Sequence, residues 1–445
     1  MKYVPSLLLA FWVVIGCAPV WAQDKAEQAP AEALAFEIPE NDEGLPGAGP
    51  LRRYEWFKEL WSRKRSAWAK RLQEDQKAIV FLGDSITQGW GDIMGGSFPG
   101  MKVANRGISG DTTRGMLIRL QDDVLALNPT AVVLLMGTND LEEGAAPEVI
   151  AGNVKLIVAA LKAHSPQMPI VLCKVFPSAA SKKRPADQIQ KINERCVAAV
   201  QGDPQITVME TWVLFADEQG NAKKAEFPDL LHPNKAAYAK WAATLRPIFA
   251  TLGYLETEPD EFKLEEGFES LFNGKDLSGW MFQKTGNTKR KASPSRPIWK
   301  EDLSFDGKSE SIDGRFAVVN GRLVVTTPPA GRRFQQMWTK RRFANDFVLK
   351  LEFRATAFAD SGVFIRKPQL QCRDFVLAGP WKDLKNYKPQ DWNELVVTVR
   401  GTVAHCTCNG EVLEAAMKVP ASGPIGLEGD RGQVEYRRIR IKESP

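Results

Sequence analysis

The sequence predicts two folded units of different class, a doubly wound α/β domain followed by an antiparallel β-sandwich. In the first half, short and almost wholly apolar runs alternate with helical stretches, a pattern typical of parallel strands covered on both faces. From residue 267 onward, short alternating strands separated by turn signals replace that pattern. The chain has 445 residues and 44% hydrophobic content, which is enough for two packed cores.

The α/β pattern also predicts where a ligand binds. The predicted strands are residues 78–82, 131–136, 170–175 and 206–209, and the predicted helices are residues 113–127, 146–163, 187–200 and 233–249. Ligands of open parallel sheets lie outside the carboxyl ends of the strands. Ser85 and Asn139 each follow a predicted strand, so we expect both at one edge of the sheet.

The N-terminal segment has the composition of a targeting sequence. Residues 1–22 are predicted to be a signal peptide cleaved after Ala22. Residues 14–17 also resemble a lipobox, in which Cys17 would be lipidated. Either route predicts an exported protein, periplasmic or extracellular, which contacts a membrane only through lipidation at Cys17.

Composition predicts the remaining boundaries. Residues 23–50 are rich in Ala, Glu, Pro and Gly and predict a flexible tether, and residues 254–266 predict an acidic linker. The two domains are then residues 51–253 and 267–445. The net charge of +5 is small, and acids are interspersed with the basic residues, so no nucleic-acid partner is expected.

An aromatic stripe precedes the first predicted strand. Apolar residues recur at helical spacing among many Arg and Lys residues: Leu51, Tyr54, Phe57, Trp61, Trp68 and Leu72. A basic amphipathic helix on a membrane surface is one interpretation. We favour a helix that packs this stripe against the sheet, because a strand follows at once.

Ser85 is the candidate nucleophile. It follows Gly83 and Asp84 where a strand gives way to a helix, so its hydroxyl can project from the sheet edge while its own N–H faces an incoming carbonyl oxygen. A helix N-cap serine would have the same sequence context. Asp84 is interpreted as a structural carboxylate.

Few side chains are available as a base for Ser85. His405 lies in the second half, and His164 is placed where a helix ends. His232 remains, at the predicted start of a helix with proline in the first turn. Asp229 precedes it by three residues and can hold the imidazole in one tautomer. The predicted triad is therefore Ser85, His232 and Asp229.

Two further residues are candidate oxyanion donors beside the N–H of Ser85. Gly107 can bring a backbone N–H close to the substrate because it has no side chain, and Asn139 can donate through its amide. A turn glycine and a loop cap are the structural alternatives.

The four segments that carry these residues resemble the blocks of the SGNH, or GDSL-type, hydrolase family. They are residues 83–85, 105–113, 136–140 and 229–232, and they are similar to the subgroup of platelet-activating-factor acetylhydrolase catalytic subunits and bacterial carbohydrate O-acetylesterases. The resemblance implies a flavodoxin-like sheet, no metal or other cofactor, and ester hydrolysis through an acyl-enzyme. It assigns Ser85, Gly107, Asn139, Asp229 and His232 the roles given above.

The glycine-rich segment 88–100 follows the nucleophile and carries Trp90, Met94 and Phe98. It is either a mobile wall that sets acyl size or a long surface loop.

The second half predicts a β-sandwich. The predicted strands are residues 322–327, 347–355, 362–366, 394–400, 402–408 and 434–442, with hairpins at Asn320-Gly321 and Asn409-Gly410. Residues 267–280, 360–366 and 423–427 resemble the concanavalin-like 3-keto-disaccharide hydrolase-type domain, which implies a sugar context. No acid and base pair is evident between residues 366 and 392, so binding is favoured over hydrolysis.

Two sets of side chains in this domain have more than one interpretation. Tryptophans either stack on sugars or pack the sandwich, and the candidates are Trp280, Trp299, Trp338, Trp381 and Trp392. Export permits a disulfide between Cys372 and either Cys406 or Cys408. The cysteine spacing is not that of a zinc site.

The sequence as a whole predicts an exported serine esterase that removes short acyl groups, with acetyl favoured, from an acylated glycan that the β-sandwich helps to hold. The alternative is a carbohydrate-binding or glycoside-cleaving protein in which the β-sandwich carries the main activity.

Overall fold

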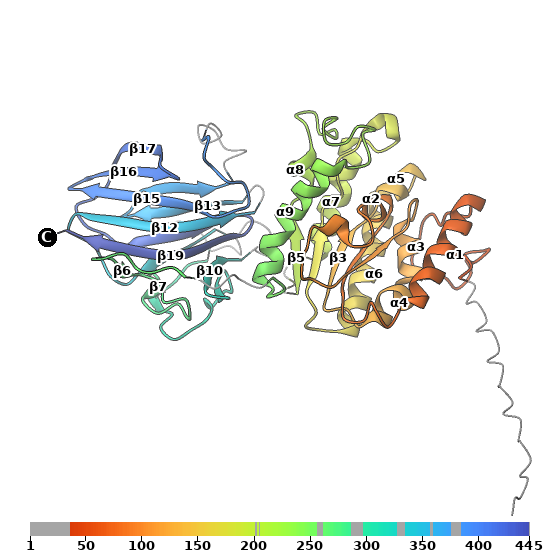
Figure 1. Cartoon of the computed structure of the whole chain (residues 1–445), viewed down its shortest axis with the longest axis horizontal. Coiled ribbons are helices and arrows are strands. Elements are labelled where there is room, and N and C mark those ends of the chain that lie inside the picture. The colour runs from red at the N-terminus through yellow and green to blue at the C-terminus, as the bar shows by residue number, and fades with distance from the viewer. Residues whose placement is uncertain are drawn as a thin grey trace, which may run out of the picture. The chain divides into compact units, whose positions relative to one another are not determined.

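The computed structural model describes residues 36–200, 203, 205–255, 261–285, 297–326, 334–356, 359–374 and 384–444. The predicted signal peptide, Cys17 and Trp381 lie outside these residues. The described chain contains a parallel α/β domain and an antiparallel β-sandwich, as predicted (Figure 1).

The α/β domain is built on a five-stranded parallel sheet with strand order β2-β1-β3-β4-β5. The strands are β1 (Ile79–Gly83), β2 (Val103–Gly107), β3 (Ala131–Leu135), β4 (Ile170–Cys173) and β5 (Ile206–Met209). This is the flavodoxin-like order, in which the order of the strands reverses between β1 and β3. In such sheets ligands bind at this point, outside the carboxyl ends of the strands.

Strand β2 was not predicted. Its two polar residues, Asn105 and Arg106, break the apolar pattern, yet both are buried. The Asn105 amide donates to the carbonyls of Thr87 and Gly91, and the Arg106 guanidinium donates to Asp75 Oδ2 at 2.7 Å. Polar side chains are tolerated in this strand because the tertiary structure satisfies their hydrogen bonds.

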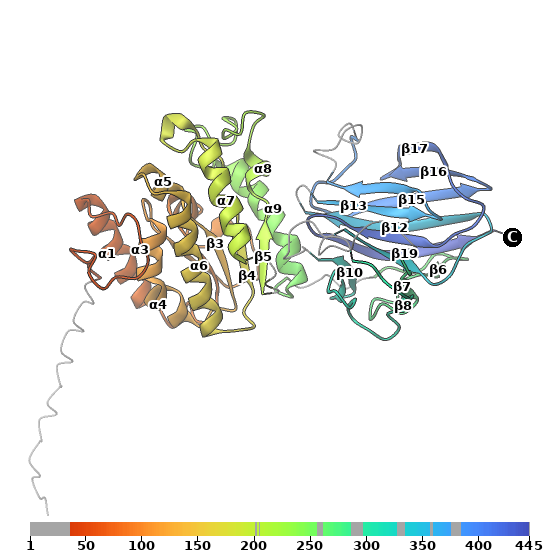
Figure 2. The same cartoon turned by 180° about the vertical axis from the view of Figure 1, so that it is seen from behind.

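Two separate hydrophobic clusters cover the faces of the sheet. One face packs on α2 (Ser85–Gly89), α8 (Trp212–Phe215) and α9 (Lys235–Thr251), and the other packs on α3 (Thr113–Ile118), α4 (Leu120–Asp123), α6 (Pro147–His164) and α7 (Ala186–Val200). Helix α9 is nearer the viewer in Figure 1, and α6 and α7 are nearer in Figure 2. Burial on both faces explains the continuous apolar strands.

Two helix predictions are corrected. The helix expected over residues 113–127 is divided into α3, α4 and a 3₁₀ turn at Leu125–Leu127, because the backbone leaves helical geometry at Arg119, whose buried side chain pairs with Asp111 at 2.7 Å. The helix expected to open at His232 begins three residues later. Asn234 is its N-cap and accepts from Ala237 N–H, so His232 lies in the preceding loop.

The segment 36–50, predicted to belong to a flexible tether, is packed on the α/β domain. Ile38 is buried beside Leu51, and the side chain of Asn153 on α6 makes two hydrogen bonds with the backbone of Ala48. Arg114 also donates to the Gly49 carbonyl at 3.0 Å. The segment is fixed by contacts from α3 and α6 that composition alone does not show.

Helix α1 (Glu55–Lys70) buries Phe57, Trp61 and Trp68. The stripe was expected to pack against the sheet, but these rings form a separate cluster with Ile38, Leu51 and Ile108. The rings of Trp61 and Trp68 lie near buried guanidinium groups, Arg119 beside both and Arg106 beside Trp68. Tyr54 and Trp56 are different, because half of each side chain is exposed, at 51%.

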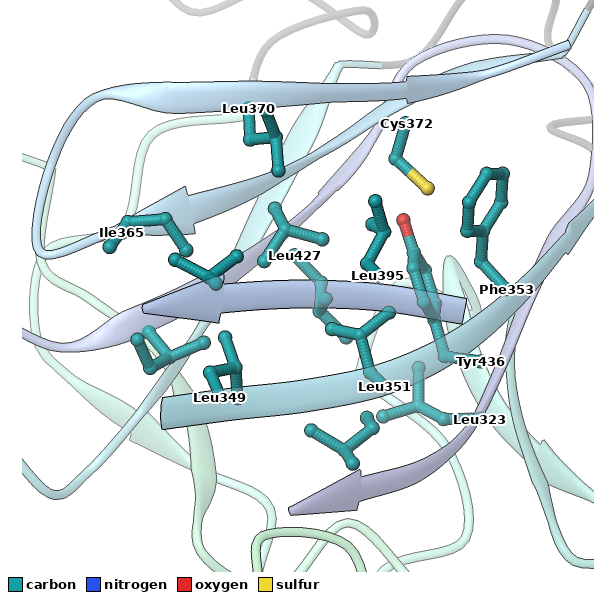
Figure 3. Packing of buried hydrophobic residues seen from close by; sticks show 14 of the residues in the cluster. Leu323, Leu349, Leu351, Phe353, Ile365, Leu370, Cys372, Leu395, Leu427 and Tyr436 are labelled. Carbon is teal, nitrogen blue, oxygen red and sulfur yellow. The ribbon is translucent and has the colours of Figure 1, made fainter. Parts of the chain in front are cut away.

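The C-terminal domain is a sandwich of two antiparallel sheets. One has the order β17-β16-β15-β12-β19-β10-β9 with β6 beside β19, and the other has the order β14-β13-β18-β11-β7-β8. Figure 3 shows side chains of both sheets meeting in the core. The first sheet consists of β6 (Glu269–Ser270), β9 (Phe316–Val319), β10 (Arg322–Val325), β12 (Phe347–Ala355), β15 (Asn393–Arg400), β16 (Val403–Cys408), β17 (Glu411–Lys418) and β19 (Val434–Glu443). The second consists of β7 (Trp280–Phe282), β8 (Leu303–Ser304), β11 (Gln335–Thr339), β13 (Asp360–Ile365), β14 (Gln369–Arg373) and β18 (Ile425–Gly429).

Both Asn-Gly hairpins were predicted correctly. Asn320-Gly321 joins β9 to β10, Asn409-Gly410 joins β16 to β17, and all four residues have positive φ. The disulfide that export would permit is not formed, since Cys372, Cys406 and Cys408 are buried free thiols. The expected linker is also packed at its described ends: Tyr254 donates to the Thr130 carbonyl, and Glu265 pairs with Arg440 at 2.6 Å. No helix within the described residues combines the length and hydrophobicity needed to cross a bilayer.

Candidate active site

Ser85 lies at the carboxyl edge of the sheet, two residues after the end of β1. It is the first residue of α2, and Asp84 caps this helix by accepting from Ile86 N–H at 2.9 Å. Burial raises the pKa of Asp84 to about 6, opposed by the hydrogen bond from Ile86. Ser85 is thus not the N-cap. Its N–H is one of the orphan donors at the helix start, and it has no partner among the described residues.

The structure brings the predicted triad together. His232 Nε2 lies 3.0 Å from Ser85 Oγ, and His232 Nδ1 lies 2.7 Å from Asp229 Oδ2. With the proton on Nδ1, the imidazole donates to Asp229 and leaves Nε2 free to accept from the serine hydroxyl. The other two histidines lie elsewhere in the fold, His164 at the end of α6 and His405 on β16.

A tight loop holds the histidine in this position. Asp229 Oδ1 accepts from the N–H groups of Leu231 and His232, at 3.0 and 2.7 Å. Leu230 has a φ of +64°, and its carbonyl accepts from the Ser178 hydroxyl at 2.8 Å. A left-handed leucine costs conformational energy, so the loop depends on these hydrogen bonds.

The same contacts set the charge of Asp229. Partial desolvation raises the pKa of this carboxyl, but the hydrogen bonds from His232 and Leu231 outweigh it and lower the pKa to about 2. Asp229 therefore remains ionised at every pH at which the protein would be assayed, and it can stabilise a positively charged imidazole.

Asn139 is placed as a donor by a buried arginine that the sequence analysis did not identify. Arg184 Nη2 donates to Asn139 Oδ1 at 3.0 Å, and Arg184 Nε donates to the Thr138 carbonyl at 3.0 Å. The amide nitrogen is then directed to the Asp111 carbonyl, also at 3.0 Å, with its second N–H still available. Arg184 fixes which way the amide points, because a guanidinium can only donate.

Gly107 is not the backbone donor that was predicted. Its N–H donates to Asn105 Oδ1 at 2.8 Å. A Cβ at this position would lie 2.3 Å from the backbone nitrogen of Gln88, so the residue is glycine because β2 ends against α2. The assignment of Gly107 to the oxyanion hole is therefore corrected.

Gly110 has the properties expected of that donor. It is buried, its φ is +86°, and its N–H has no partner among the described residues. The next residue, Asp111, accepts from the Asn139 amide, which places Gly110 beside the second donor. The sequence contained a signal for this residue, because Ser109-Gly110-Asp111 has the composition of a turn, in which glycine adopts the left-handed conformation.

Two other expectations concern the surroundings of the triad. Trp90, Met94 and Phe98 of the segment 88–100 are buried in the cluster that contains Phe81 and Trp241, so these side chains do not form a mobile wall. Among the described residues, no group of three or more His, Cys, Asp or Glu side chains is arranged to hold a metal ion.

A serine, a histidine with its orienting carboxylate, and donors at the end of a parallel sheet define a serine hydrolase of the α/β class. The model of the GDSL-like lipase/acylhydrolase family matches residues 81–240, and that of the 3-keto-alpha-glucoside-1,2-lyase-like domain matches residues 267–442. The chain thus contains a GDSL (SGNH) lipase/acylhydrolase domain and a C-terminal 3-keto-disaccharide hydrolase-like domain, and it is a hydrolase.

Individual proteins match the first of these domains. The chain is 26% identical over 199 residues to platelet-activating factor acetylhydrolase IB subunit alpha1 of Pongo abelii, covering 43% of this chain and 84% of that protein. It is 26% identical over 208 residues to subunit alpha2 of Homo sapiens, covering 45% and 87%. A solved GDSL-like lipase of Bacteroides thetaiotaomicron gives a TM-score of 0.38 at 25% identity, covering 44% and 97%.

The first prediction concerns Asp229→Asn. Asn Oδ1 can still accept from Leu231 and His232 N–H, so we expect the loop to fold, but the amide favours the wrong imidazole tautomer. We expect kcat on p-nitrophenyl acetate to fall roughly 10³- to 10⁴-fold with an unchanged circular dichroism spectrum. A loss below about threefold would remove Asp229 from the mechanism.

Single and double variants separate the effect of Asn139 on kcat from that of Arg184. We expect Asn139→Ala to lower kcat by about 10²- to 10³-fold with little change in KM. Arg184→Met removes the donors that orient the amide, and we expect a fall of roughly 10-fold in kcat. In the Asn139→Ala background, Arg184→Met should then have no further effect on kcat. A further fall of about 10-fold in the double variant would show that Arg184 acts independently of Asn139.

Proposed function

We propose that the α/β domain hydrolyses short-chain carboxylic esters, with acetyl as the acyl group, through an acyl-enzyme on Ser85. The observation that carries the proposal is the hydrogen-bonded series Asp229–His232–Ser85. The names of the curated relatives support acetyl, since they are acetylhydrolases.

The chemistry follows from the geometry. As Ser85 Oγ bonds to the acyl carbon, His232 Nε2 takes the hydroxyl proton and the carbonyl π electrons move to oxygen. The N–H groups of Ser85, Gly110 and Asn139 stabilise that oxyanion. Collapse breaks the bond to the alcohol, which leaves with the proton from His232. Water then attacks the acyl-enzyme by the same steps and releases the carboxylic acid.

We further propose that the alcohol half of the ester is a carbohydrate. Support comes from the outer face of the six-stranded sheet, where the register places Trp338, Phe364, Gln369 and Glu428 on one side. Trp338 and Phe364 are in contact, with ring centroids 4.9 Å apart, and Gln369 donates to Glu428. Phe364 and Glu428 are themselves buried, so the partly exposed Trp338 and Gln369 are the groups that a sugar ring and its hydroxyls would contact.

The other candidate tryptophans contribute less to such a face. Trp280 is fully buried in the core, Trp299 stacks on Phe282, and the ring of Trp392 is in contact with the guanidinium groups of Arg354 and Arg437.

A second candidate function is suggested by carboxylates on the same face of the six-stranded sheet. The register places Asp360 on the face that carries Glu428, and the sequence analysis identified neither carboxylate. Asp360 pairs there with Arg373 and Arg431. In this alternative the sandwich cleaves or binds glycans as the main activity. Retention of glycan cleavage by the Ser85→Ala variant would support it.

We also propose that the protein is exported to the periplasm or the extracellular space, on the apolar segment at its N-terminus. Mass spectrometry of the mature N-terminal peptide should find cleavage after Ala22 or a lipidated Cys17. An intact Met1 in protein from its native cells would contradict export.

The test of the esterase proposal is labelling and turnover. A fluorophosphonate should label the wild-type chain and not Ser85→Ala. Turnover of p-nitrophenyl esters should be highest for acetate and lower by at least about 10-fold for octanoate, because an acetyl site excludes longer chains. Labelling of both proteins would sink the assignment of Ser85, and a preference for octanoate would sink the assignment of acetyl.

A further inference from the structure

An exposed aromatic pair borders the oxyanion donors. A Cβ built on Gly110 would lie 2.6 Å from Cη2 of Trp56, so the indole ring packs directly against this glycine. The glycine at position 110 is thus required by its φ of +86° and also by the neighbouring ring. Trp56 is part of α1, yet half of its side chain remains exposed.

Tyr54 extends the apolar surface of Trp56. The two rings are nearly parallel, with an interplanar angle of 11° and centroids 6.3 Å apart, and each residue is 51% exposed. Trp56 also makes an edge-to-face contact with buried Phe57, and their ring centroids are 5.6 Å apart. Two large rings are therefore held in a fixed orientation beside the position of the reacting carbonyl.

Polar groups frame this pair. Arg52 donates to Glu143 Oε1 at 2.7 Å and to Glu142 Oε2 at 2.5 Å, and the Tyr54 hydroxyl donates to Glu143 Oε2 at 3.3 Å. Arg52 also reaches Gly110, since a Cβ there would lie 2.9 Å from Arg52 Nη1. Both glutamates belong to the segment that begins with Asn139, so the frame and the oxyanion donor are joined by a short stretch of chain.

We propose that Trp56 and Tyr54 form a subsite that binds the sugar ring of the ester's alcohol half by stacking, with Glu142 and Glu143 accepting hydrogen bonds from its hydroxyls. This inference rests on the proposed ester hydrolysis at Ser85. The C–H groups of a pyranose face pack on aromatic rings, and its hydroxyls need acceptors at the edge.

The chemistry of the frame favours a neutral sugar over a lipid or an anion. A lipid chain needs a continuous apolar channel, whereas the ring pair is bordered by two carboxylates, with side chains 37% and 22% exposed. An anion is disfavoured because the nearby guanidinium groups are already paired with these carboxylates, Arg52 with both and Arg184 with Glu142.

The test compares two kinds of ester on the full-length chain. The probes are acetylated xylo-oligosaccharides, peracetylated methyl glucoside and ethyl acetate, which has no ring to stack. We expect Trp56→Ala to raise KM for the two sugar esters about 10-fold, so that selectivity for sugar ester over ethyl acetate, as a ratio of kcat/KM, falls by a similar factor. Tyr54→Ala should lower the same ratio, and Trp56→Phe should restore most of it.

Leu156→Ala, on the exposed face of α6, is the matched control and should leave the ratio unchanged. An equal fall of kcat on all three probes in Trp56→Ala would overturn the subsite, since Trp56 would then only support Gly110. An unchanged ratio in both Trp56→Ala and Tyr54→Ala would also overturn it while the esterase proposal stands. Turnover of ethyl acetate but of neither sugar ester by the wild type would overturn the subsite and the proposed carbohydrate substrate together.

Discussion

The pairing of β1 with β2 on one side and β3 on the other is the constraint on which the site depends. Parallel pairing aligns Gly83 with Gly107 and with Leu135, so three separate segments leave the sheet at one edge. Ser85, Gly110 and Asn139, the proposed nucleophile and oxyanion donors, each lie a few residues after the end of one of these strands. His232 arrives from a fourth segment, 147 residues after Ser85, and closes the site with one hydrogen bond.

Buried polar groups hold this edge together as much as apolar packing does. Arg119 pairs with Asp111 with both side chains fully buried, and Arg184 ties the Asn139 amide to the Thr138 backbone. A buried ion pair contributes little net stability, but removal of one partner is costly because the other charge is left without compensation. Such pairs therefore specify one geometry, which the donors of an oxyanion hole require.

The segment before α1 packs on the α/β domain, whereas its composition predicted a free tether. Residues 36–50 are fixed by α3 and α6, and this contact delivers Arg52 and Trp56 to the loop that contains Gly110. A domain defined only by its strands and helices would omit one wall of the proposed subsite. Tyr54 and Trp56 follow this segment and are half exposed, whereas Phe57, Trp61 and Trp68 are buried.

The sequence alone determined the class of both domains and both Asn-Gly hairpins, because hydrophobic period and turn chemistry are local properties. It also predicted the three residues of the proposed triad, which the structure brings within hydrogen-bonding distance. It placed Ser85, Asp229 and His232, since a chain with three histidines leaves few bases to choose from. Only the tertiary structure decided between Gly107 and Gly110, because the choice depends on whether Asn105 has taken the N–H. Strand β2, the role of Arg184 and the position of Trp56 likewise depend on partners remote in the chain, which no local pattern encodes.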